Sequence, residues 1–126
     1  MSDYLNHVQD LLKGWGKWAR RGGLNLGYQP TFLSLSRARR QLNPNLEMIM
    51  DLNDDDALAV DACVSEMILQ HPRQHEVAIH TYRYNVAAMV SAKALSCSKS
   101  TILNDRRFII EYVGELLPKI KEKTKN

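Results

Sequence analysis

The sequence predicts one small all-α domain that contains a helix-turn-helix. Three observations lead to this prediction. The chain has 126 residues, of which 44% are apolar, and this is enough for a single domain with a buried core. Apolar residues recur at intervals of three and four along most of the chain, as they do in amphipathic helices. Near the C-terminus, a short turn sequence separates two of these helical segments.

The first predicted helix spans residues 3 to 21. Its apolar residues follow the helical period, Ser2 is a suitable N-cap, and Gly22 is a typical stop signal. Two glycines, Gly14 and Gly16, lie inside this helix, where each costs about 1 kcal/mol relative to alanine. Because helix propensity disfavours them, we expect these glycines to permit a close backbone approach between packed elements.

A loop and a second helix are predicted next. Residues 24 to 46 interrupt the helical period and are expected to connect the two helices, although residues 36 to 42 could form a short basic helix. The second helix begins at Asn53, a good N-cap that three aspartates follow at the positive end of the helix dipole. It ends at His71, because Pro72 restrains the residue before it. Its expected apolar stripe is Ala57, Val60, Val64, Met67 and Ile68.

Residues 73 to 84 are predicted to form a third helix. The apolar pattern there is ambiguous, because Val77, Ile79 and Thr81 also alternate as they would in a strand. Asn85 follows, and asparagine tolerates the left-handed conformation that a turn often needs.

Two helices and a tail complete the predicted domain. A short helix covers residues 87 to 95, and a long one runs from 99 to about 117, where Pro118 is expected to stop it. We therefore place the helix-turn-helix at about residues 87 to 117. The lysine-rich residues 118 to 126 are expected to form a flexible basic tail.

Charge is divided unevenly along the chain. Residues 1 to 40 hold seven Lys and Arg and two acids, residues 41 to 76 hold one and eight, and residues 77 to 126 hold nine and four. Basic ends indicate a polyanion partner. The acidic middle indicates either a basic protein surface or self-shielding, and solvated faces of alternating sign would give the same pattern.

The strongest local signal is the run Ala-Lys-Ala-Leu-Ser-Cys-Ser-Lys-Ser-Thr-Ile over residues 92 to 102. A helix-turn-helix requires a small residue where its two helices cross and apolar residues at the turn. It also requires a cap for the second helix, here Ser98, and an inward-pointing apolar residue, here Ile102. In such motifs the leading end of the second helix enters the major groove. Lys99 suits a phosphate or guanine, Ser100 a phosphate or base edge, and Asn104 an adenine edge. The alternative is a capped turn between two ordinary packed helices.

Residues 73 to 102 resemble the fourth region of bacterial sigma factors and related response-regulator domains. The resemblance is carried by Arg73-Gln74-His75-Glu76-Val77, Tyr82, Asn85 and the run from 92 to 102. In those domains a preceding helix packs under the helix pair. Two positions depart from the pattern: Ser91 replaces a large aliphatic residue, and Arg106 stands where an apolar side chain is preferred.

A second resemblance covers nearly the whole chain. The segments Trp15-Gly16-Lys17-Trp18-Ala19-Arg20 and Leu26-Gly27-Tyr28-Gln29-Pro30 are similar to the W-G-x-W-x-R and L-G-Y-P signatures of the antitermination protein Q family of lambdoid bacteriophages. Tyr4-Leu5, residues 57 to 61 and residues 79 to 82 also resemble that family. Gln29 intrudes before Pro30, and residues 31 to 50 match no part of the pattern.

The second resemblance implies a phage transcription antitermination factor. Such proteins bind double-stranded DNA at a late promoter, engage RNA polymerase paused nearby with its sigma factor, and make it read through terminators, partly by narrowing the RNA exit channel. On that model the DNA contacts lie within residues 98 to 107. Thr101 is then a DNA-binding candidate together with Lys99, Ser100 and Asn104. Arg106 and Arg107 are expected to lie near the DNA backbone.

The same model makes the N-terminal segment and the acidic residues 51 to 61 candidates to contact polymerase, sigma factor, nascent RNA or a second copy of the protein. The N-terminal candidates are Trp15, Lys17, Trp18, Arg20 and Arg21. Large rings beside cations are typical of interfaces. Ordinary burial in the core is the alternative for the tryptophans.

No residue pattern indicates an enzyme, a metal or a cofactor. Asp54, Asp55 and Asp56 point about 100° apart on a helix and do not converge on one ion. Pro72 breaks the spacing by which His71 and His75 could chelate zinc. Two cysteines are too few for a disulfide framework or a cysteine-built zinc site.

No apolar run approaches the roughly 20 residues that span a bilayer, so we expect no membrane contact and a location in the host cytoplasm. Two other functions fit the same sequence. One is a conventional phage helix-turn-helix regulator, and the other is a helical adaptor that binds protein only. Steep salt dependence of DNA binding would exclude the adaptor.

Overall fold

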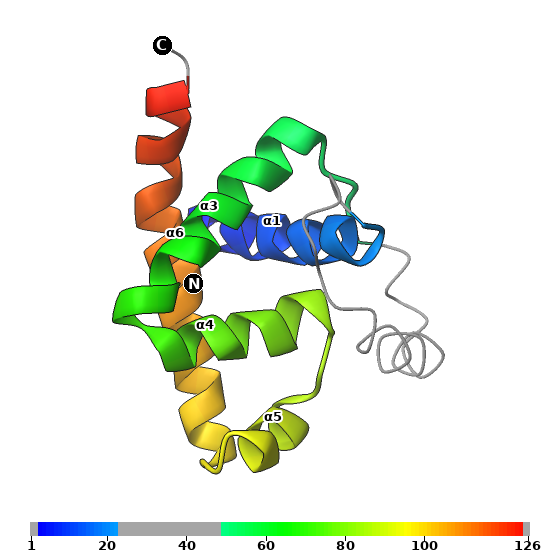
Figure 1. Cartoon of the computed structure of the whole chain (residues 1–126), viewed down its shortest axis with the longest axis vertical. Coiled ribbons are helices and arrows are strands. Elements are labelled where there is room, and N and C mark those ends of the chain that lie inside the picture. The colour runs from blue at the N-terminus through cyan, green and yellow to red at the C-terminus, as the bar shows by residue number, and fades with distance from the viewer. Residues whose placement is uncertain (1–2, 23–48, 125–126) are drawn as a thin grey trace.

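The computed structural model describes residues 3 to 22 and 49 to 124, and every regular element in these two segments is a helix (Figure 1). The elements are α1 (Asp3–Arg20), α3 (Asp54–Gln70), α4 (Pro72–Ala78), the π-helical segment η3 (Ile79–Arg83), α5 (Ala88–Ala94) and α6 (Lys99–Thr124). The predicted all-α class is therefore confirmed. The strand alternative for residues 77 to 81 is wrong, and the predicted loop over residues 24 to 46 lies outside the described residues.

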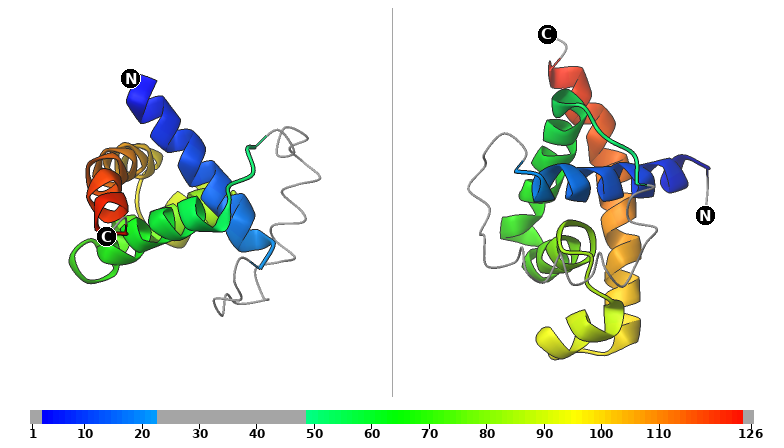
Figure 2. Two further views of the ribbon diagram at one scale, coloured as in Figure 1. Left: turned by 90° about the horizontal axis from the view of Figure 1, so that it is seen from above. Right: turned by 90° about the vertical axis from the view of Figure 1, so that its right-hand side faces the viewer.

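Helix α6 is the central helix against which most of the others pack. Figure 2 shows α1 and α3 crossing it at different angles, and α5 lying beside its first turns at the end opposite the C-terminus. It contacts α1, α3, α4 and α5. One cluster of buried apolar side chains fills the space between these helices and includes Leu12, Trp15, Val64, Met67, Ile102 and Ile109.

The second predicted helix is confirmed in its boundaries and in most of its stripe. Asn53 caps α3, because its Oδ1 accepts a hydrogen bond from the backbone N–H of Asp56 at 2.8 Å. Four of the five predicted stripe residues are buried, but Ile68 is 49% exposed. Successive helical residues point about 100° apart, so Ile68 turns away when its neighbour Met67 faces the core.

Residues 72 to 83 form one continuous helical stretch that changes its winding. Pro72 occupies the first turn of α4, where the missing N–H costs nothing, and η3 then winds more widely. The backbone N–H of Tyr84 bonds to the carbonyl of Ile79 at 3.1 Å. Asn85 has a φ of 54°, which confirms the predicted left-handed turn.

Helix α1 crosses η3 so closely that only glycine fits at the crossing. A Cβ atom at Gly16 would overlap the backbone carbonyl of Tyr82. A Cβ atom at Gly14 would lie 2.8 Å from the side-chain Cγ of Leu52. The expected close backbone approach is confirmed at Gly16, whereas the nearest neighbour of Gly14 is the Leu52 side chain, outside this crossing. Arg20 completes the crossing, because its guanidinium donates to the carbonyls of Tyr82 and Arg83, each at 2.9 Å.

The predicted end of the last helix at Pro118 is wrong, since α6 continues to Thr124. Proline lacks an N–H, and this frees the carbonyl of Gly114, four residues earlier. The hydroxyl of Tyr4 donates to that carbonyl at 2.5 Å. Beyond the proline, Lys121 pairs with Asp56 at 3.3 Å. Residues 118 to 124 are therefore a helical, anchored segment rather than a flexible tail.

We expect Tyr4→Phe to lower the free energy of unfolding by about 1 kcal/mol, because the Gly114 carbonyl loses its donor. In a Pro118→Ala background, the new backbone N–H of residue 118 serves that carbonyl, so Tyr4→Phe should cost less than half as much. A double-mutant cycle by urea denaturation measures the difference. Equal costs in both backgrounds would contradict the assigned hydrogen bond.

We expect Gly16→Ala to destabilise the protein by about 3 kcal/mol or more, because the new methyl group meets backbone that cannot move aside. Gly14→Ala should cost less, since the Leu52 side chain can change rotamer. Lys13→Ala, at an exposed position of the same helix, is the control and should change stability by no more than about 0.5 kcal/mol. Denaturant midpoints measure all three, and a tolerated Gly16→Ala would refute the close crossing.

Candidate nucleic-acid interface

Helices α5 and α6 are joined by a tight four-residue turn. Ser96 in this turn has a φ of 54°, and the backbone N–H of Cys97 donates a hydrogen bond to the carbonyl of Ala92 at 2.9 Å.

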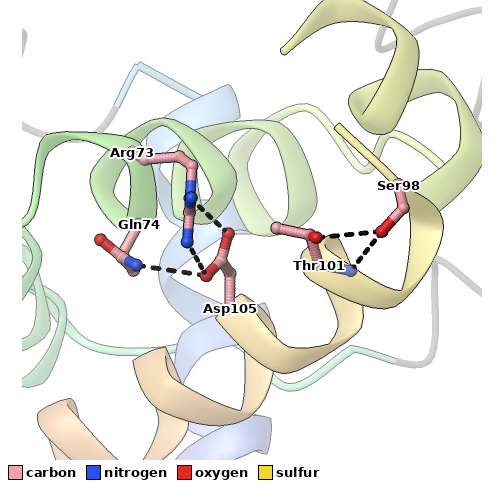
Figure 3. A network of polar contacts seen from close by, with 5 residues as sticks. All are labelled: Arg73, Gln74, Ser98, Thr101 and Asp105. Atoms are coloured by element: carbon pink, nitrogen blue, oxygen red, sulfur yellow. Dashed lines mark hydrogen bonds and ion pairs between the residues drawn. The ribbon is translucent and has the colours of Figure 1, made fainter. Parts of the chain in front are cut away.

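Ser98 caps α6, because its Oγ accepts a hydrogen bond from the backbone N–H of Thr101 at 3.1 Å and lies 2.9 Å from the hydroxyl of that residue (Figure 3). The predicted cap is confirmed, and so is the inward position of Ile102, which is fully buried. Thr101 completes the cap with its hydroxyl.

A buried carboxylate fixes the second turn of α6 against α4. Asp105 is 4% exposed and accepts two hydrogen bonds from the guanidinium of Arg73, at 3.0 and 3.1 Å, and one from the amide of Gln74 at 3.2 Å (Figure 3). The hydrogen bond with Asp105 raises the pKa of Arg73. Because this ion pair is bidentate, it restricts rotation of α6 about its axis. Sequence reasoning missed Asp105, although it is the single acid between Lys99 and Arg107.

Arg106 is held by two hydrogen bonds within the protein. Its Nε donates to the hydroxyl of Thr81 and a terminal nitrogen donates to the carbonyl of Val86, both at 3.1 Å. Burial lowers the pKa of Arg106. The expectation that Arg106 lies near a DNA backbone stays a prediction. The geometry of Arg106 explains an arginine where the sigma-like pattern prefers an apolar residue, because its stem is half-buried and its head bonds to the η3 region.

Four of the six residues predicted to bind DNA share one exposed stripe at the start of α6. Lys99, Ser100 and Asn104 are exposed, and so is Arg107. Arg107 pairs with Glu111 on its own helix, at 3.3 Å, with 80% of its side chain exposed. Figure 1 shows this end of α6 beyond α1 and α3, beside α5. The stripe carries net positive charge from Lys99 and Arg107, because the neighbouring carboxylate of Asp105 is paired with Arg73.

The two tryptophans of the N-terminal segment belong to the core. Trp15 is 1% exposed and Trp18 is 8% exposed. The indole N–H of Trp15 donates to Asp61 at 3.1 Å, and that of Trp18 donates to Asp54 at 2.8 Å. Both rings therefore follow the alternative of core burial in the described structure. A buried indole needs a hydrogen-bond acceptor, and the acidic helix α3 supplies both.

The cations of the same segment are mostly used within the protein. The Lys17 ammonium donates to the carbonyl of Ile49 and pairs with Asp51, each at 2.9 Å. Arg21 pairs with the same carboxylate at 3.0 Å but keeps 65% of its side chain exposed. The hydrogen bond from Lys17 is the main cause of the lowered pKa of Asp51. The acidic stretch therefore shields the basic N-terminal segment, as one of the sequence alternatives proposed, and Arg20 binds the carbonyls that end η3.

Within residues 3 to 22 and 49 to 124, no three His, Cys, Asp or Glu side chains are grouped so that they could hold a metal ion. Burial raises the pKa of the Cys63 thiol to about 12, so it stays protonated and is a poor nucleophile. None of the described helices combines the length and the apolar character that a bilayer crossing needs.

Comparison with known proteins identifies one family. Neither the curated proteins nor the solved structures contain a match to the chain. The family model described as Phage antitermination protein Q matches residues 5 to 124. This match includes both tryptophans, the α1–η3 crossing and all of the α5–α6 pair. The chain therefore belongs to the phage antitermination protein Q family.

Proposed function

We propose that this protein is an antitermination factor that binds duplex DNA at a late promoter through the α5–turn–α6 unit. It then engages RNA polymerase paused nearby with its sigma factor and makes the enzyme read through terminators. The observation that carries the DNA-binding part is the exposed stripe of Lys99, Ser100, Asn104 and Arg107, on a helix whose other face is fixed by Asp105.

The chemistry of this stripe suits a duplex. The first N–H groups of a helix have no partner within it, and together with the helix dipole they attract phosphate. Lys99 and Arg107 add cations on either side of the base-reading positions, where they can hold phosphates or guanine. Asn104 offers the donor and acceptor pair that fits an adenine edge in the major groove. Ser100 lies one turn earlier and can contact a phosphate or a base edge.

Engagement of polymerase is supported by membership of the family and needs a surface other than the tryptophans. Of the N-terminal cations, Arg21 keeps most of its side chain in solvent, whereas Lys17 is held by the backbone of Ile49. We therefore assign Arg21 to the partner-facing surface. Polymerase, sigma factor, nascent RNA and a second copy of the protein are the candidate partners there.

Lys99→Ala combined with Asn104→Ala should weaken binding to late-promoter DNA at least about tenfold, because one phosphate contact and one base contact are lost. Both positions are exposed, so the fold should survive. Fluorescence anisotropy across a salt series measures affinity, and Lys99→Ala alone should reduce the magnitude of the salt slope by about one. Lys119→Ala removes an exposed charge at the other end of α6 and serves as the matched control. Undiminished sequence-specific binding by the double variant would refute the groove assignment.

The antitermination activity is tested by transcription in vitro. A template with the late promoter and a downstream terminator is transcribed by polymerase holoenzyme with and without the protein. We expect readthrough RNA with the wild type and its loss with the double variant. Unchanged termination despite specific DNA binding would identify a conventional regulator. Absence of salt-dependent DNA binding would identify an adaptor that binds protein only.

A further inference from the structure

We propose that Leu103 determines part of the DNA specificity by contacting the C5 methyl group of a thymine. This inference rests on the proposed function, because it assumes that the leading end of α6 lies in a major groove. Its basis is a side chain that has no place in the core of this chain. Leu103 is 47% exposed, although it lies between polar and cationic residues.

Helix geometry places Leu103 in the middle of the exposed stripe. Residues three and four apart are neighbours on a helix surface, so Leu103 adjoins Ser100 one turn before it and Arg107 one turn after it. The inward-facing positions are already occupied, since Ile102 is fully buried and Asp105 is 4% exposed. Leu103 therefore projects toward whatever the stripe contacts.

The major groove offers one apolar group among its base edges, the methyl group of thymine. A leucine side chain pressed against the amino group of cytosine or the carbonyl of guanine would remove water from those atoms without giving them a hydrogen bond. Against a thymine methyl, the same side chain gains contact and loses no hydrogen bond. Leu103 should thus favour a thymine, located within about two base pairs of the adenine that Asn104 contacts.

The test removes the methyl group and nothing else. A duplex is first selected from a random-sequence pool with the full-length wild-type protein. Each thymine in it is then replaced singly by deoxyuridine, which pairs identically but lacks the methyl group. We expect one such replacement to weaken wild-type binding about three- to fivefold, as the burial of one methyl group implies. Leu103→Ala should bind the thymine and deoxyuridine duplexes with equal affinity.

Leu69→Ala is the matched control, because Leu69 is 91% exposed on α3, away from the stripe. This variant should retain the full deoxyuridine penalty. Both alanine variants should match the wild type in circular dichroism. A wild type without any deoxyuridine penalty, or a Leu103→Ala variant that keeps it, would overturn the role of Leu103 while leaving DNA binding intact. Failure to enrich any duplex would overturn the proposed function and this inference together.

Discussion

The close crossing of α1 over η3 is the contact on which the rest of the molecule depends. Gly16 lets the two backbones meet, and Arg20 binds the carbonyls of Tyr82 and Arg83. Those carbonyls belong to the last residues of a π-helical segment, where backbone carbonyls commonly accept from groups outside the helix. The crossing therefore stabilises a backbone shape that would be unfavourable alone. Because η3 precedes the turn into α5, this shape sets the direction in which the α5–α6 unit leaves the core.

Two hydrogen-bonded side chains of α6 join the exposed stripe to the neighbouring helical elements. Arg106 connects α6 to Thr81 within η3 and to the turn after it, and Asp105 connects α6 to α4 through Arg73. Together they fix the rotation of α6 about its axis. The residues between these anchors and the N-cap are then presented to solvent in one orientation, which is what a base-reading surface requires.

The W-G-x-W-x-R signature has a physical explanation in these contacts. The two indoles fill the core and donate to the acidic helix α3, the glycine permits the crossing, and the arginine binds the carbonyls of η3. Every named position of the signature therefore maintains the fold. The proposed recognition chemistry lies about 80 residues later, on a different helix. The scaffold and the proposed reading surface are thus carried by separate parts of the chain.

Local sequence determined most of the helices, their N-caps and the turns. The helical period, Asn53 and Ser98 as N-caps and Asn85 in a left-handed turn all depend on residues within a few positions of each other. The family was also evident from sequence. An exposed stripe at the start of α6 followed from the spacing of Ile102 in the turn pattern.

Tertiary structure decided what each polar or aromatic side chain does. Tyr4 and Gly114 are 110 positions apart, yet their hydrogen bond lets α6 pass through Pro118. The tryptophans proved to be core, because acceptors for their N–H groups come from α3, and Arg106 proved structural, because Val86 presents a carbonyl to it. A helical period specifies which side of a helix is apolar. Only the packed neighbours determine which donors and acceptors meet a given side chain, since a buried polar group is stable only where its partner lies.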